Sequence, residues 1–154
     1  MSYECEIKEY PARLALSIRT KTTLEDLPEV TRKAYAAISQ YLGELGEQPA
    51  GDPFAAYHNL DMQDLDVDLG FPVSGMLPGR GEIKPYEIPE SRVVTCLHIG
   101  PHSEVEPAYN ALFRWIIDNG HEATGMAYEV YLSDPDKTPS QELKTRIILP
   151  LKNE

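Results

Sequence analysis

The sequence predicts an α+β fold made of two related β-α-β-β halves, in which an antiparallel sheet carries two helices on one face and leaves the other face for function. Three observations support this prediction: two segments with helical periodicity, eight short segments with strand-like alternation, and an element order that recurs. The chain has 154 residues, which suits one domain, because domains of about 100 to 200 residues are the norm. We expect a single domain over residues 1–154, with pseudo-repeats at about 1–75 and 82–154.

The first half contains one predicted helix flanked by strands. Apolar residues recur every three or four positions between Val30 and Leu45, which is typical of an amphipathic helix. Asp26 suits the helix start and Gly46 its end. Alternating runs predict strands at 4–10, 12–21, 54–60 and 65–73.

The second half repeats this order. A helical stripe runs from Val105 to Ile116, Ser103 and Glu106 have the spacing of a capping box, and Gly120 follows the helix. Alternating runs predict strands at 83–88, 92–99, 126–132 and 143–149.

The two halves also share letters. Ala56-Tyr57-His58 parallels Ala127-Tyr128-Glu129, and residues 69–73 parallel residues 147–151, each with a proline at the fourth position. This alignment places His58 at the repeat position of Glu129. Because side chains alternate along a strand, Phe54 and His58 should share a face of the sheet.

The charge of the chain limits its partners. Fourteen basic and twenty-five acidic side chains give a formal net charge of -11, which repels phosphate backbones and disfavours direct nucleic-acid binding. No run approaches the roughly 18 apolar residues of a membrane span. Cys5 and Cys96 stand far apart without a partner motif, which favours a reducing cytoplasm over secretion.

Motifs for cofactors and metals are missing from the sequence. It has no nucleotide-binding glycine motif and no zinc-protease or serine-hydrolase signature, so we expect no cofactor. His98 and His102 stand four apart, but Gly100 and Pro101 would break a helix between them, so we expect no metal.

A row of alternating carboxylates is also expected to hold no metal. Asp64, Asp66 and Asp68 mimic the start of a calcium loop, but Leu69 stands where that loop needs glycine. We therefore assign the three side chains to the polar face of a strand.

The segment 126–132 is the most informative part of the sequence. Its alternation puts Glu129 and Tyr131 side by side on one face of a strand. If the helices leave that face uncovered, Glu129 projects into a cleft among aromatic rings. The alternative is an exposed glutamate on a solvated sheet face, because unpaired glutamate is rarely buried.

The chain resembles the gyrase-inhibitor-like (GyrI-like) small-molecule-binding superfamily, which includes effector-binding domains of AraC-type and MerR-type regulators. The resemblance covers nearly the whole chain and rests on Gly100-Pro101, Ala108-Tyr109, Leu112, Trp115-Ile116, Tyr128-Glu129-Val130-Tyr131-Leu132, Asp134-Pro135 and Gly70-Phe71-Pro72-Val73. It implies that Glu129 lies at the base of an aromatic groove and meets cationic, hydrophobic ligands, with Tyr131 beside it. His102 departs from the family, which often has tyrosine there.

The resemblance implies three kinds of function. The first is a free-standing effector-binding or sequestering protein for a small aromatic, amphiphilic and cationic molecule. We expect Glu129, Tyr131, His58 and Phe54 to contact it in a cleft between the halves. Without ligand, burial should favour protonated Glu129.

The second is a hydrolase of strained, electrophilic toxins, with Glu129 and Tyr131 as catalytic candidates. The third is interaction with DNA gyrase.

Overall fold

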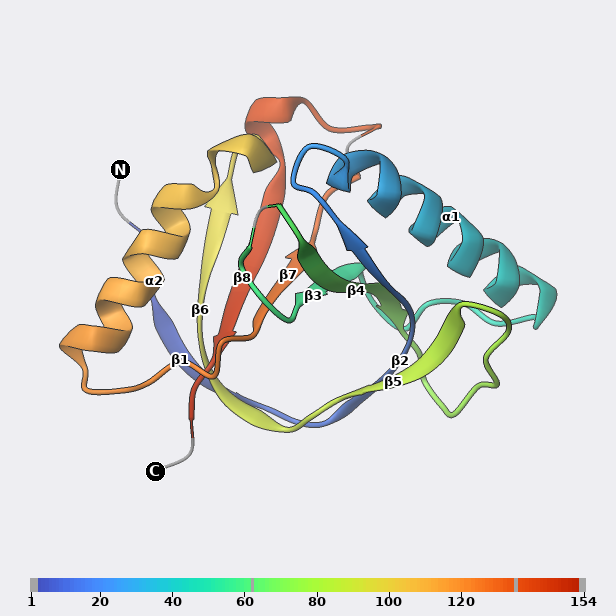
Figure 1. Ribbon diagram of the computed structural model, residues 1–154, viewed down its shortest axis with the longest axis horizontal. Helices are drawn as coiled ribbons and strands as arrows, with labels where there is room; N and C mark the ends of the chain where they lie inside the picture. The colour runs from blue at the N-terminus through green and yellow to red at the C-terminus, as the bar shows by residue number, and fades with distance from the viewer. Residues whose placement is uncertain (1–2, 62, 135, 153–154) are drawn as a thin grey trace. The chain divides into compact units, whose positions relative to one another are not determined.

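The computed structural model of the chain describes residues 3–61, 63–134 and 136–152. The outermost residues of the expected domain, and Pro135 of the family resemblance, lie outside the described residues. The predicted α+β fold, with its repeated element order, is confirmed (Figure 1). Its elements are β1 (Glu6–Tyr10), β2 (Arg13–Thr22), α1 (Leu27–Glu44), β3 (Phe54–Tyr57), β4 (Leu65–Pro72), β5 (Ile83–Ile88), β6 (Ser91–Ile99), η1 (His102–Glu104), α2 (Glu106–Asp118), β7 (Ala127–Tyr131), η2 (Ser140–Glu142) and β8 (Lys144–Pro150), where η marks a short 3-10 helix.

The chain forms two compact units, which we call the α1 unit and the α2 unit after their helices. The α1 unit contains β2, α1, β3, β4 and β5, and the α2 unit contains β1, β6, α2, β7 and β8. Strand β1 pairs with β6, and β5 pairs with β2, both antiparallel. Each unit therefore includes the leading strand of the other pseudo-repeat.

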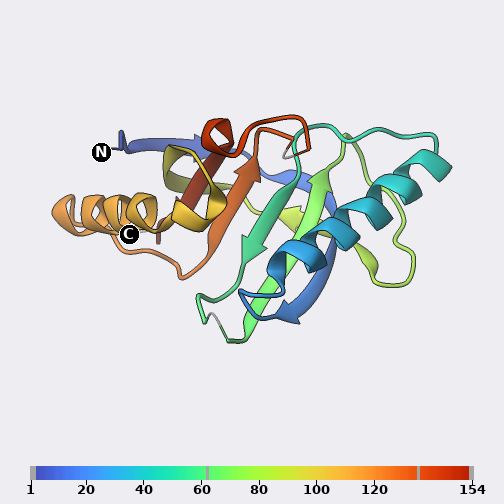
Figure 2. The same cartoon turned by 90° about the horizontal axis from the view of Figure 1, so that it is seen from above.

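The α1 unit is a four-stranded antiparallel sheet in the order β3-β4-β2-β5. Helix α1 packs on β4 and β2, as its position across these strands in Figure 2 also shows. Full burial of one large apolar side chain stabilises a fold by about 1.5 to 3 kcal/mol, so this shared face contributes much of the unit's stability. Its core consists of Leu16, Ile38, Tyr41, Leu42, Val73 and Ile83.

The α2 unit is a four-stranded antiparallel sheet in the order β1-β6-β8-β7. Helix α2 contacts β6 and β8. Its apolar stripe is buried, as the spacing of the sequence predicts. The buried apolar residues of this unit include Val94, Cys96, Ala108, Leu112, Ile116, Ile147 and Leu149.

The ends of the helices agree with the sequence except at the start of α2. Residue 103 lies in η1, so α2 begins at Glu106 with Val105 as its N-cap and with no side-chain cap bond. The predicted capping box of Ser103 and Glu106 is therefore wrong, because the 3-10 turn takes up the residues before the helix. Within the described parts of the chain, neither helix has the length and apolar character required to cross a membrane.

Candidate functional site

Glu129 is a buried carboxylate in the middle of β7. Its residue is 3% exposed, although it is charged and lies on a short strand. The hydroxyl of Tyr131, two residues further along, donates a hydrogen bond of 2.9 Å to Oε1. The predicted side-by-side arrangement of carboxylate and phenol is confirmed. The alternative of a solvated glutamate on an open sheet face is wrong.

Two further side chains contact this carboxylate. Nε2 of His102, in η1, lies 2.6 Å from Oε1 of Glu129. The hydroxyl of Tyr109, in the first turns of α2, donates to Oε2. The imidazole of His102 also lies edge-on to the ring of Tyr131, with ring centroids 5.9 Å apart. We call Glu129, His102, Tyr109 and Tyr131 the Glu129 cluster.

The Glu129 cluster keeps the carboxylate charged. Burial raises the pKa of Glu129, but hydrogen bonds from His102, Tyr109 and Tyr131, together with the charge of His102, lower it, and the net direction is down. The hydrogen bond to Glu129 raises the pKa of His102, against the effect of burial. The expectation that Glu129 is protonated without ligand is therefore wrong, because three donors replace the lost water.

Glu129 lies on the face of its sheet that α2 covers. It pairs with Ile147 of β8, which pairs with Cys96 of β6, and paired residues share a face. Sγ of Cys96 lies 4.0 Å from the carbonyl oxygen of Ala108 in α2, and Tyr109 reaches Glu129 from the same helix. The expectation that Glu129 projects from an uncovered face is wrong. The carboxylate lies beside the N-terminal part of the helix.

The strand registers also correct the letter-based repeat alignment of His58 with Glu129. In the α1 unit Ala55 pairs with Leu69, and in the α2 unit Glu129 pairs with Ile147. Leu69 and Ile147 stand at the same distance before a strand-ending proline. The repeat counterpart of Glu129 is therefore Ala55, which is fully buried. Only one repeat carries the carboxylate at this position.

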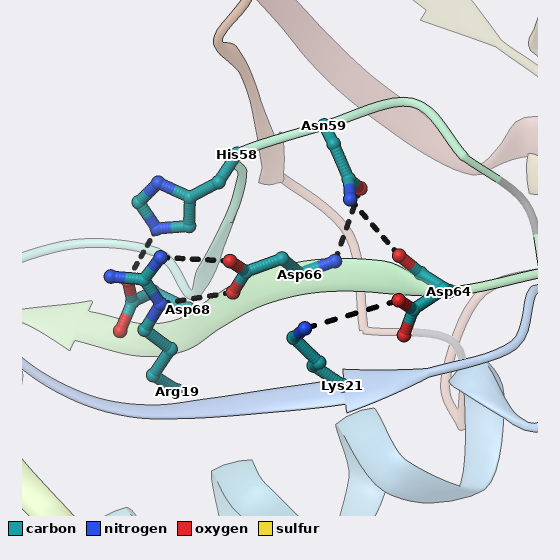
Figure 3. Close-up of polar contacts among 7 residues, drawn as sticks. All are labelled: Arg19, Lys21, His58, Asn59, Asp64, Asp66 and Asp68. Carbon is teal, nitrogen blue, oxygen red and sulfur yellow. Dashed lines mark hydrogen bonds and ion pairs between the residues drawn. The ribbon is translucent and has the colours of Figure 1, made fainter.

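His58 contacts a second buried carboxylate, in the α1 unit. Its Nε2 lies 2.7 Å from Oδ2 of Asp68, while the hydroxyl of Ser17 donates a bond of 2.9 Å to Oδ1. Asp68 is 4% exposed. Arg19 binds the next carboxylate on the same strand, that of Asp66, through two hydrogen bonds (Figure 3). Asp66 and Asp68 lie in β4 as predicted, whereas Asp64 precedes the first residue of the strand, Leu65, so its assignment to the strand is wrong.

Phe54 lies on the same sheet face as His58, as the alternation predicts. It pairs with Gly70 and therefore faces away from α1, which packs on the side of Leu16 and Phe71. Phe54 is buried, and its ring is stacked against Tyr86 with centroids 6.4 Å apart. The structure thus brings Glu129 and Tyr131 together in one unit, and His58 and Phe54 together on one sheet face of the other.

Sequence reasoning did not assign a role to His102 or Tyr109. His102 follows the Gly100-Pro101 turn, where it stood out as a rejected metal-ligand candidate and as a departure from the family. Tyr109 comes directly after Ala108 of the buried helical stripe. A tyrosine at the edge of that stripe, in the first turns of the helix, was the available signal that it could reach a neighbouring strand.

His98 and His102 take separate partners, so they do not converge on a metal. His98 accepts a hydrogen bond from Tyr3 at Nδ1 and donates one to the carbonyl of Pro101 from Nε2, both at 3.0 Å, whereas His102 contacts Glu129. Among the described residues, no group of three or more histidine, cysteine or acidic side chains is placed to hold a metal ion.

Several solved structures share this fold. The C-terminal domain of EcmrR is 25% identical over the full length of both chains, with a TM-score of 0.85. In the EcmrR–DNA complex the identity is 26% and the TM-score 0.87, over 99% of this chain. The present chain spans 58% of the length of EcmrR in that complex. No curated protein matches the chain significantly by sequence.

Two more distant structures show the fold alone. A hydrolase from Listeria innocua is 18% identical, covers 97% of this chain and 92% of its own, and gives a TM-score of 0.70. SAV2435, solved with tetraphenylphosphonium bound, is 10% identical over 99% of this chain and 94% of its own, with a TM-score of 0.70.

The match to a protein family extends over nearly the whole chain. Residues 3–152 match the family described as the GyrI-like small molecule binding domain. This span includes both compact units and every residue of the Glu129 cluster. The chain therefore belongs to the GyrI-like small-molecule-binding domain family.

Proposed function

We propose that this protein binds a small, aromatic, amphiphilic cation and that Glu129 is its charge partner. The observation that carries the proposal is a carboxylate only 3% exposed, held in its charged form by three donors. Burying a charge is costly unless it is paired, so such a residue is a candidate for function. Membership of a small-molecule-binding family supports the same conclusion.

The side chains around Glu129 suit an aromatic cation. Tyr109 and Tyr131 supply flat rings beside the carboxylate, and a cation over such a ring gains about 0.5 to 2 kcal/mol, depending on desolvation. Removing one member of a desolvated charge pair costs about 2 to 5 kcal/mol. Glu129 is therefore expected to contribute more to cation affinity than either tyrosine.

Phe54 and His58 are proposed as further residues that contact the ligand. Phe54 offers an aromatic ring and His58 a partly exposed imidazole, both on the sheet face away from α1. His58→Ala and Phe54→Ala variants should weaken ligand binding without changing its dependence on Glu129. Unchanged affinity in a folded variant would show that this residue does not contribute to ligand binding.

The cellular setting follows from composition. Cys5 and Cys96 are both free thiols, which supports a reducing cytoplasm. A net charge of -11 speaks against direct contact with nucleic acid. We therefore propose that the protein acts in the cytoplasm as a receptor or sequestering protein for its ligand.

The test is a direct binding titration, in which quenching of intrinsic fluorescence reports the bound fraction. Tetraphenylphosphonium is a suitable cationic probe, and triphenylphosphine oxide is a neutral aromatic of similar shape. Wild type is compared with Glu129→Gln and with Glu122→Gln, which alters an exposed glutamate of the same unit. We expect Glu129→Gln alone to lose at least about tenfold in cation affinity, equivalent to about 1.4 kcal/mol. Equal affinity of all three proteins for the cation would refute the proposal.

A hydrolase is the second candidate, and the contact between Glu129 and Tyr131 favours it. A carboxylate and a phenol in hydrogen-bond contact can divide the roles of base and acid. The lowered pKa of Glu129 argues the other way, because such a carboxylate is a weak base. Turnover of a strained alkylating substrate by wild type, lost in Glu129→Gln, would establish hydrolysis. Binding without turnover would exclude it for that substrate.

A further inference from the structure

His102 contacts the carboxylate of Glu129, the group that the proposed function assigns to the cation of a ligand. Its Nε2 is 2.6 Å from Oε1 of Glu129, so the protonated imidazole and the carboxylate form an ion pair. Tyr131 also donates to Oε1, and Tyr109 donates to Oε2. A carboxylate has about four acceptor positions, of which these donors fill three. The charge of Glu129 is thus already balanced by a group of the protein itself.

We propose that His102 determines which ligands the Glu129 site accepts, acting as an internal counter-ion that competes with cationic ligands. A cationic ligand then binds with high affinity only to the form in which His102 has lost its proton. A neutral aromatic ligand meets no such competition. This inference rests on the proposed function, since it concerns the ligand of the same site.

The exposure of the cluster supports competition at this position. The side chain of His102 is 40% exposed, whereas that of Glu129 is 3% exposed. Tyr109 and Tyr131 are both intermediate in burial. The three donors are thus all more exposed than the carboxylate that they contact, and His102 is the one that carries a charge. A ligand cation that approaches Glu129 meets a like charge as long as His102 is protonated.

The local backbone allows His102 to leave this position. It begins η1, a helix of only three residues, directly after the Gly100-Pro101 turn. Gly100 has a φ of 133°, a conformation that glycine adopts without strain. Once neutral, the imidazole loses its charge attraction to Glu129 and can turn toward solvent, because much of it is already exposed.

The titratable groups around His102 define the direction of the pH effect. Glu129 and Tyr131 face it from β7, and Tyr109 of α2 acts on it through the shared carboxylate. Glu104 is exposed on the same short helix. The hydrogen bond to Glu129 raises the pKa of His102 above its ordinary value. His102 therefore holds its proton to higher pH, and cation affinity should rise as pH rises through that pKa.

The experiment measures the affinity of tetraphenylphosphonium between about pH 5 and pH 9, the range in which histidine titrates. For wild type we expect a gain of about tenfold per pH unit below the pKa of His102 and a plateau above it, because one proton is released for each cation bound. His102→Gln should bind as wild type does on its plateau, at every pH. Glu104→Gln should follow wild type, and triphenylphosphine oxide should bind independently of pH.

The outcomes separate this inference from the function on which it rests. Cation binding by wild type that does not vary with pH overturns the role of His102 and leaves the proposed function standing. Failure of the cation to bind at any pH, in wild type and in His102→Gln, overturns the proposed function. If His102→Gln does not fold, the imidazole resonances of wild type provide a second measurement. Saturation with the cation should then lower the pKa of His102, and an unchanged pKa would contradict the inference.

Discussion

Nε2 of His102 lies 2.6 Å from Oε1 of Glu129, and the two residues come from separate elements 27 positions apart. The pair joins a side chain that titrates near neutral pH to a carboxylate that solvent hardly reaches. Its two members also shift each other's pKa in opposite directions, since the pKa of Glu129 is lowered and that of His102 is raised.

The ion pair should make stability depend on pH in a defined window. The lowered pKa of Glu129 contributes stability above its unfolded value of about 4.3, and this is lost as pH falls through the folded pKa. The raised pKa of His102 contributes stability below about 6.5, which is lost as pH rises through the folded pKa. The pair is therefore strongest at about pH 5 to 6.

Comparison of wild type with His102→Gln tests this window. The difference in unfolding free energy should be largest at about pH 5.5 and decline by pH 9. We expect it to stay below about 1 kcal/mol, because His102 is 40% exposed and solvent screens the pair. Urea unfolding at both pH values measures it. A difference that does not change with pH would contradict the assignment of the ion pair.

Tyr109→Phe should reduce the stabilisation of the ionised Glu129 carboxylate. It removes the hydroxyl that donates to Oε2 of Glu129, so the pKa of Glu129 should rise and the fold should lose about 1 kcal/mol. In the Glu129→Gln background the same change should cost less, because the charged acceptor is already gone. A double-mutant cycle by urea unfolding gives the coupling energy. Full additivity would mean that the two side chains do not interact.

The cluster was only partly predictable from the sequence, for a physical reason. Period-two alternation is local, so it placed Tyr131 beside Glu129 correctly. The contacts of His102 and Tyr109 with Glu129 span 27 and 20 positions and depend on how α2 packs on its sheet. The covered face, and with it the charge state of Glu129, could not be derived from alternation, which is the same for both faces.

The repeat shows the same limit of local patterns. Letter similarity aligned His58 with Glu129, whereas the ladder registers align Ala55 with it. Two strands keep the same alternating pattern when their assumed alignment is shifted along the sequence. Only the pairing partners Leu69 and Ile147 fix the register. The element order and strand positions depend on spacing alone, which is why they were predicted well.

Two glycine substitutions with opposite expected effects test the backbone packing of the α1 unit. A Cβ at Gly70 in β4 would lie 2.3 Å from the carbonyl oxygen of Leu16, so Gly70→Ala should destabilise the fold by at least about 2 kcal/mol. Gly43 in α1 has open space where a Cβ would lie, so Gly43→Ala should stabilise the fold by about 0.5 to 1 kcal/mol. Thermal unfolding measures both. Equal melting temperatures for the two variants would be inconsistent with this packing.

The buried carboxylate of Asp68 should matter more to stability than its exposed neighbour. Asp68→Ala leaves Ser17 and His58 without their shared acceptor, at a cost of about 1 to 3 kcal/mol. Asp66→Ala removes an ion pair in which Arg19 is largely exposed. Such a pair contributes less than about 1 kcal/mol to the free energy of unfolding. Urea unfolding of both variants compares them. A larger loss in Asp66→Ala would contradict the structural role given to Asp68.

The proposed point of contact with the ligand is the charged carboxyl group of Glu129. The most direct test of this contact is a titration with tetraphenylphosphonium, followed through the side-chain carboxyl carbon of Glu129 by NMR in protein labelled with carbon-13 and assigned with Glu129→Gln. We predict that the chemical shift of this resonance is that of an ionised carboxylate at neutral pH. During the titration it should change with the same dependence on ligand concentration as the bound fraction. Saturable binding that leaves the Glu129 resonance unmoved would contradict the account.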